Sequence, residues 1–110
     1  MSQNNQREYY RIFYRPPFQP LFVCDHGKFA VVDISEGGFR FSIKKGAAIF
    51  EGSFIEGTIQ LPQKRGSVFV KGLVLRHFER EIAVVLDPDG RIPLAKIMEE
   101  QRVLIKRGSL

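Results

Sequence analysis

The chain contains little of the side-chain chemistry on which most enzymes depend. Its 110 residues include one cysteine, two histidines and no tryptophan. Cys24 cannot form an internal disulfide, and because it follows three apolar residues we expect a half-buried strand residue in a reducing compartment. One cysteine and two histidines furnish neither a zinc cage nor a Cys–His nucleophilic pair, and no glycine-rich phosphate loop opens a helix. We therefore expect a protein that is not an enzyme and that uses no metal or cofactor.

Long apolar runs are also missing. No segment approaches the roughly 20 apolar residues of a membrane span, and residues 1–5 lack the apolar core of a signal peptide. The expected location is therefore the cytosol. A chain of 110 residues is long enough for one domain with a single core.

An excess of positive charge is present, but it is confined to the two ends of the chain. There are 17 Lys and Arg against 12 Asp and Glu, a net charge of +5. Residues 16–101 contain eleven of each kind, whereas residues 1–15 contribute +2 and residues 102–110 contribute +3. Proteins that bind long nucleic acids usually carry a positive stripe across the folded surface. The neutral body therefore disfavours that class.

Most of the chain is predicted to be β-structure. Alternating apolar and polar residues, with turn signals between them, indicate strands over residues 18–24, 29–34, 38–43, 54–61, 67–76 and 80–86. In the clearest of these, Phe39, Phe41 and Ile43 share one face and Arg40 lies on the other. Strands with one apolar face fit an antiparallel sheet whose outer face is solvated.

The last segment changes to a helical period. Pro93 suits the first position of a helix. Apolar residues then recur at helical spacing, at Leu94, Ile97, Met98, Leu104 and Ile105. We expect a helix over about residues 93–105 that covers an open end or seam of a small six-stranded antiparallel barrel. Residues 1–17 end in two prolines and are expected to form a flexible arm, hinged to a domain of residues 18–110.

Two short motifs carry the functional signal. In the first, Arg7 and Arg11 are four residues apart, so that they fall on one side of a helix or of an extended arm. A guanidinium is always charged and matches phosphate oxygens or the O6/N7 edge of guanine. The second motif consists of Asp33, Ser35 and Gly38. Its carboxylate can accept hydrogen bonds from both donors of a guanine Watson–Crick edge, and its glycine lets a ligand approach the backbone.

Each motif alone also has an ordinary interpretation. The arginines can belong to a solvated basic tail, and the second motif can be a plain turn between strands. The aromatic residues of the arm, Tyr9, Tyr10 and Phe13, are expected to anchor it on the barrel, with base stacking as the alternative.

Taken together, the R-x-x-x-R pair, a proline hinge, one strand and D-x-S-x-x-G resemble the signature of PilZ domains, the bacterial receptors for cyclic di-GMP. The resemblance extends over nearly the whole chain. It includes a late strand that ends in Arg76 and is followed by an apolar strand over residues 82–86. The family fold is a six-stranded antiparallel Greek-key barrel with a C-terminal helix, which agrees with the strand and helix patterns above.

The resemblance implies a role for each residue of the two motifs. Arg7 and Arg11 would clamp the phosphates and the guanine Hoogsteen edge of cyclic di-GMP. Asp33 and Ser35 would hold a guanine edge and nearby polar atoms, and Gly38 would keep the approach open.

Three further positions bear on ligand binding, and the sequence leaves their role open: two arginines and one glutamine. Arg40 lies on the solvent face beside the second motif, and Arg76 corresponds to a position that some relatives use; both can contact the ligand or remain solvated. Many relatives carry another arginine just before the first pair, where this chain has Gln6. Either one nucleotide or a self-intercalated pair therefore remains compatible with the sequence.

The leading hypothesis is a cyclic di-GMP receptor whose arginine arm closes on the ligand and changes the surface offered to an unidentified downstream protein. One alternative is a PilZ-like interaction module that does not respond to the nucleotide. Another is a small barrel that binds single-stranded nucleic acid, which the neutral body disfavours.

Overall fold

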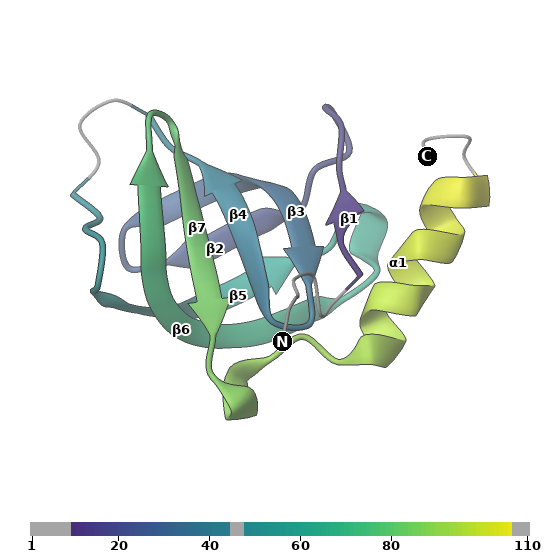
Figure 1. Ribbon diagram of the computed structural model, residues 1–110. Helices are drawn as coiled ribbons and strands as arrows, with labels where there is room; N and C mark the ends of the chain where they lie inside the picture. Colours follow the sequence, from purple (N-terminus) through teal and green to yellow (C-terminus); the bar gives the residue numbers. More distant parts are fainter. Residues whose placement is uncertain (1–9, 45–47, 107–110) are drawn as a thin grey trace, which may run out of the picture.

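The computed structural model describes residues 10–44 and 48–106, and within them seven strands precede one α-helix (Figure 1). The strands are β1 (Ile12–Phe13), β2 (Leu21–Cys24), β3 (Gly27–Ser35), β4 (Gly38–Ser42), β5 (Phe54–Gln60), β6 (Ser67–Phe78) and β7 (Glu81–Leu86). Two short 3-10 turns, Pro62–Lys64 and Pro88–Gly90, precede β6 and the helix α1 (Leu94–Lys106), respectively.

The strands β2 to β7 form a closed antiparallel barrel. Their order is β3–β2–β5–β6–β7–β4, and the pairing of β4 with β3 closes the sheet. Closure leaves no unpaired edge between the six strands. The predicted fold class, a six-stranded antiparallel barrel followed by a C-terminal helix, is therefore confirmed.

The structure adds one strand that the sequence pattern did not indicate. β1 lies within the segment expected to be an arm, and it pairs with β3 so that Ile12 is opposite Ile34. Ile12 and Tyr14 are buried in the core. Ile12 and Tyr14 thus anchor this segment on the barrel, whereas the predicted anchors Tyr10 and Phe13 are about half exposed. The third predicted anchor, Tyr9, lies outside the described residues. The strand predicted from residue 18 begins only at Leu21, after a turn in which the backbone N–H of Phe18 donates to the carbonyl of Arg15.

Aromatic side chains fill the centre of the barrel. Phe39 and Phe41, on the predicted inward face of β4, are buried and contact Phe22 with ring centroids 4.8 and 5.0 Å apart. Rings at these separations favour tilted or edge-on contacts and bury large apolar areas. The alternation in the sequence therefore identified this inward face correctly.

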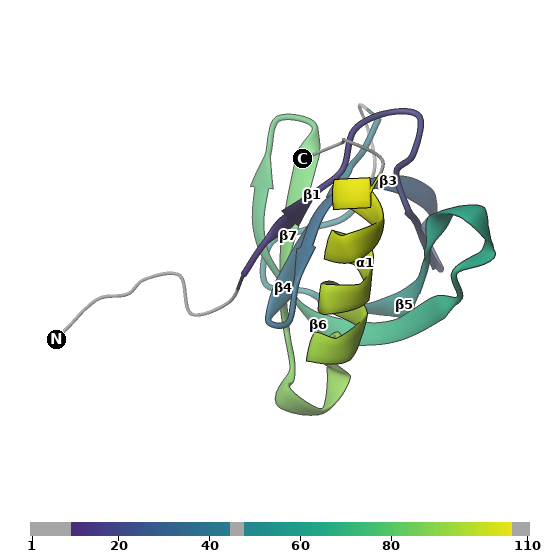
Figure 2. The same ribbon diagram turned by 90° about the vertical axis from the view of Figure 1, so that its right-hand side faces the viewer.

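The helix packs against the barrel with a face that differs from the predicted one. Figure 2 shows α1 in front of the barrel, between β4 and β1 on one side and β5 on the other. Ile97 and Leu104 are buried as predicted, but Leu94, Met98 and Ile105 are about half exposed. The buried face of α1 therefore consists of Ile97, Leu104 and one charged residue, Glu100.

Candidate functional site

A bulge in β3 turns the side chain of Asp33 towards the outer face of the barrel. In the β3–β4 pair, Val31 lies opposite Phe41 and Asp33 lies opposite Arg40, so Val32 has no counterpart. Because side chains alternate along a strand, one extra residue moves the following side chains to the other face. Asp33 therefore shares the outer face with Arg40, whereas Val31 and Phe41 point into the core.

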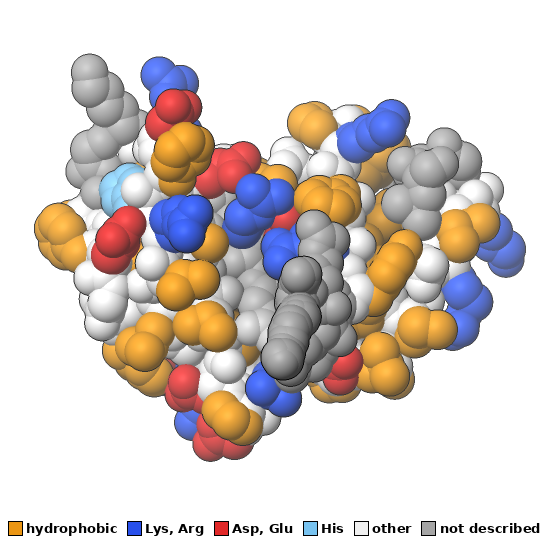
Figure 3. All heavy atoms as spheres, in the orientation of Figure 1, with side chains coloured by type: hydrophobic (Ala, Val, Ile, Leu, Met, Phe, Trp, Pro, Cys, Tyr) orange, Lys and Arg blue, Asp and Glu red, His pale blue; other side chains and the backbone are white. Residues whose placement is uncertain are grey.

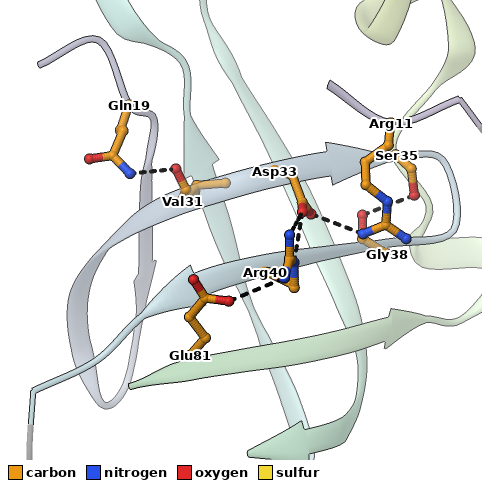
Figure 4. Close-up of polar contacts among 8 residues, drawn as sticks. All are labelled: Arg11, Gln19, Val31, Asp33, Ser35, Gly38, Arg40 and Glu81. Carbon is orange, nitrogen blue, oxygen red and sulfur yellow. Dashed lines mark hydrogen bonds and ion pairs between the residues drawn. The ribbon is translucent and has the colours of Figure 1, made fainter. Parts of the chain in front are cut away.

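Asp33 is nevertheless fully buried, because two arginines cover it (Figure 4). Arg11 Nη1 donates to Asp33 Oδ1 at 3.2 Å, and Arg40 Nε donates to Asp33 Oδ2 at 2.7 Å. Phe13, opposite Asp33 in the β1–β3 pair, lies under the Arg40 guanidinium, 6.0 Å from its carbon to the ring centroid. The hydrogen bond to Asp33 raises the pKa of Arg40, while burial acts in the opposite direction. Both oxygens of this buried carboxylate are thus satisfied within the protein.

The two arginines also line a cleft of about 440 Å³ on the outer face. This volume lies in the range of small-molecule sites. The lining contains three arginines, one glutamate and four apolar residues: Arg11, Phe13, Arg40, Leu75, Arg76, Phe78, Glu81 and Ala83. Figure 3 shows cationic, acidic and apolar side chains beside one another on the face turned to the viewer. Such a lining suits an anion that also carries flat apolar surface.

A second bulge, in β6, brings two consecutive residues to the cleft. Val74 pairs with Val84 and Arg76 pairs with Ala83, so Leu75 is the extra residue. Regular alternation would send Leu75 and Arg76 to opposite faces, but the bulge lets both line the cleft.

The structure brings three of the predicted ligand contacts together. Arg11, Arg40 and Arg76 line the cleft, and Asp33 lies directly beneath the first two. Arg7 and Gln6, which were also assigned to the ligand, lie outside the described residues.

Ser35 and Gly38 are not part of the cleft lining. They lie opposite each other at the β3–β4 turn, and Ser35 Oγ donates to the carbonyl oxygen of Gly38 at 3.3 Å. A Cβ atom at position 38 would come within 2.5 Å of the carbonyl oxygen of Val84. Glycine at this position thus permits the close approach of β4 to β7, which is a structural reason independent of any ligand.

Sequence reasoning did not identify Glu81, Phe78 or Leu75 as cleft residues. The alternation in residues 81–86 places Glu81 and Ala83 on the outer face of β7, which was the available signal. Nothing in the sequence states that β7 pairs with β4, and this pairing is what brings Glu81 within 3.2 Å of Arg40.

A buried polar network on the other side of β1 was also missed. The fully buried Glu100 of α1 accepts a hydrogen bond from the Tyr14 hydroxyl at 2.8 Å. Arg65 forms a bidentate pair with the same carboxylate, with contacts of 2.7 and 2.9 Å. Burial, followed by the charge of Glu100, raises the pKa of Tyr14, and the hydrogen bond to Glu100 raises the pKa of Arg65. This network joins β1, the turn before β6 and α1.

Other kinds of site find no support in residues 10–44 and 48–106. In this part of the chain no group of three or more His, Cys, Asp or Glu side chains could hold a metal ion. The one α-helix found there is too short and too polar to cross a membrane.

Comparisons with known proteins agree with the fold. The family model for the PilZ domain matches residues 5–99, a range that includes both motifs. Among solved structures, the chain is similar to the crystal structure of an uncharacterised Legionella protein, with a TM-score of 0.64 and 17% identity. The likeness covers 89% of this chain and 99% of that one, and at this identity it concerns the fold alone. No curated protein sequence matches the chain.

Proposed function

Because this chain belongs to the PilZ family, whose domains are binding modules for cyclic di-GMP, we propose that it is a cytosolic bacterial receptor for this dinucleotide. The observation that carries the proposal is the arrangement of Arg11, Arg40 and Arg76 around one cleft with apolar walls. Cyclic di-GMP combines two phosphates with two flat bases. Guanidinium groups match the phosphates and the guanine O6/N7 edge, and Phe78 and Leu75 offer surface for a base. No further cofactor is required.

The ligand is proposed to act by drawing arginines away from Asp33. Arg11 and Arg40 are about one-third exposed, so a ligand in the cleft can contact both. The Nε–H of Arg11 is buried and has no acceptor among the described residues. An unpaired buried donor costs about 1–3 kcal/mol. A ligand that accepts a hydrogen bond from this Nε–H would remove that cost. Arg7 would join Arg11 on the ligand and close the N-terminal segment over the cleft.

The strand β1 offers a path from this movement to the protein surface. Arg11 precedes β1 and bonds to Asp33, whereas Tyr14 follows it and bonds to Glu100 of α1. A shift of Arg11 towards a ligand therefore acts on a two-residue strand whose other end is attached to the helix. We expect the altered positions of β1 and α1 to form the surface that a downstream protein recognises.

The expected affinity is modest. Three charge-assisted arginine contacts contribute about 4.5–9 kcal/mol, and stacking adds roughly 1–3 kcal/mol per base. Ordering the N-terminal segment costs about 2–5 kcal/mol. The balance is near −7 kcal/mol, which corresponds to a dissociation constant of about 10 µM and suits a reversible sensor.

Titration calorimetry with cyclic di-GMP tests the proposal. Arg11→Ala is expected to weaken binding about 10- to 150-fold, the equivalent of one charge-assisted contact. Arg102→Ala removes the same charge from an exposed position of α1 outside the cleft and should bind like the wild type. Wild-type protein that shows no binding up to about 1 mM, a free energy weaker than about −4 kcal/mol, would refute the proposal.

One observation favours the alternative of a ligand-independent interaction module. Phe54 lies opposite Leu73 and Leu73 lies opposite Val85, and all three are exposed on the outer face of the sheet. Contiguous exposed apolar side chains are typical of protein-binding surfaces. This alternative predicts that a downstream protein binds equally well with and without cyclic di-GMP, whereas the receptor predicts a ligand-dependent affinity.

A further inference from the structure

An apolar row crosses three neighbouring strands on the outer face of the barrel. Phe54 of β5 lies opposite Leu73 of β6, and Leu73 lies opposite Val85 of β7. These three residues are 44–56% exposed, and Leu75, the extra residue of the β6 bulge, is 61% exposed beside them. Figure 3 shows apolar side chains gathered over β6 and β7 on the face turned to the viewer. The row is therefore open to solvent across the width of three strands.

The size of this row suits a contact between two copies of the chain. Since roughly half of each side chain is exposed, the four residues leave on the order of 350 Å² of apolar surface open, within the range of functional patches on monomers. Apolar atoms make up a little more than half of a typical interface, so two such rows packed face to face would bury about 1,200 Å² in total. That area is the lower limit for a stable specific interface.

The charges on the two sides of the row differ in sign. On one side, Lys71 lies opposite Glu56, and its Nζ is 3.3 Å from a carboxylate oxygen of Asp89. One cation between two carboxylates makes this side acidic. On the other side, Arg76 is exposed and lies opposite Ala83. The ion pairs among the described residues include neither Glu56 nor Arg76. Each side is about two residues, or roughly 7 Å, from the row.

A two-fold axis along the row makes such a contact self-complementary. This axis sets the β6 strands of the two copies antiparallel and brings each Leu73 next to its symmetry mate. It also exchanges the two sides of the row, so that Arg76 of each copy faces the acidic side of the other. An axis parallel to β6 would instead place each charged group opposite its own copy, which like charges disfavour.

We propose that this face, with Phe54, Leu73, Leu75 and Val85 at its centre, is the interface of a homodimer whose two-fold axis follows the row. The contact needs no ligand, so the inference does not rest on the proposed binding of cyclic di-GMP. A second copy also covers the exposed apolar surface without a downstream protein.

Sedimentation equilibrium of the full chain without nucleotide, from about 5 to 500 µM, tests the dimer. We expect a dissociation constant of about 10–100 µM, as suits an interface of the smallest stable size. Leu73→Glu brings two negative charges together at the axis and should weaken the dimer at least about 100-fold. Leu94→Glu is the matched control, because Leu94 is 51% exposed on α1, away from this face, and this variant should dimerise like the wild type.

A charge exchange tests how the two copies are oriented. Arg76→Glu and Glu56→Arg each place like charges opposite one another across the axis, and each should weaken the dimer roughly 5- to 30-fold. The double variant restores the contact between opposite charges and should dimerise about as well as the wild type. Melting temperatures close to that of the wild type establish that the variants fold.

Wild-type protein that stays monomeric at about 500 µM would overturn the proposal and leave this face to a different protein, while the proposed nucleotide binding stands. A dimer that tolerates Leu73→Glu would overturn the choice of face. A double variant that dimerises no better than the single variants would overturn the two-fold arrangement. If Leu73→Glu does not fold, the charge exchange still decides, because Glu56 and Arg76 are both exposed.

Discussion

Replacing Tyr14 by phenylalanine removes one hydroxyl group from the buried contact between β1 and α1. Its hydrogen bond to Glu100 measures 2.8 Å, and Glu100 retains the bidentate contact with Arg65 after the change. A hydrogen bond to a charged acceptor contributes about 1.5–3 kcal/mol. We therefore expect Tyr14→Phe to lower the free energy of unfolding by that amount. For a domain of this size, each kcal/mol corresponds to a decrease in melting temperature of about 4–8 °C.

The surroundings of Tyr14 also predict how this loss of stability depends on pH. Burial and the nearby Glu100 raise the pKa of Tyr14 above its ordinary value of 10.0. Above that pH the unfolded chain releases the phenolic proton while the folded protein keeps it, so the unfolded state binds fewer protons. The contribution of Tyr14 is therefore complete below about pH 10 and declines above it by about 1.4 kcal/mol per pH unit. Tyr14→Phe has no such proton. The difference in free energy of unfolding between the wild type and Tyr14→Phe should therefore become smaller above about pH 10.

Urea unfolding followed by circular dichroism, between about pH 7 and pH 11, measures both effects. Tyr10→Phe is the matched control. The hydroxyl of Tyr10 accepts a hydrogen bond from Gln101 on an exposed part of the surface, so its loss should change stability by less than about 0.5 kcal/mol. If Tyr14→Phe is as stable as the wild type at neutral pH, or if the difference stays constant above pH 10, the account of the buried network is wrong.

Two other substitutions test the interior. Glu100→Gln leaves the largely covered Arg65 guanidinium, 16% exposed, without its counter-ion and should lower the free energy of unfolding by about 3 kcal/mol in urea unfolding. The exposed Glu99→Gln is the control and should cost less than about 0.5 kcal/mol. Equal losses in the two variants would contradict this reasoning. Gly38→Ala places a Cβ atom 2.5 Å from the carbonyl oxygen of Val84, so β4 and β7 must separate and stability should fall by about 1–3 kcal/mol. An unchanged melting temperature would show that the pair tolerates the methyl group.

The helix illustrates both the reach and the limit of sequence patterns. Its position was predicted within a residue, because Pro93 and the change of period are local signals. The face that packs was not, since Met98 is half exposed and Glu100 is fully buried. Burying a carboxylate is tolerated only when partners satisfy it, and the partners Arg65 and Tyr14 are 35 and 86 residues away along the chain.

The candidate site shows the same division between local and distant information. Arg11 and Asp33 were selected from their motifs, and the structure brings them into contact at 3.2 Å. However, Asp33 is covered by Arg11 and Arg40 and is not open to the cleft. Glu81, which does line the cleft, belongs to no motif, so its place there could not be inferred before the strands were paired.

By itself, the sequence determined the fold class, the inward face of the strands and the family, because alternation, turn residues and short motifs are local properties of the chain. Only the tertiary structure decided which side chains meet. The bulges at Val32 and Leu75 set the face on which Asp33 and Arg76 emerge, and the pairing of β7 with β4 brings Glu81 to Arg40. Strand pairing and bulges depend on the packing of the whole barrel, and therefore the cleft takes shape only when the barrel closes.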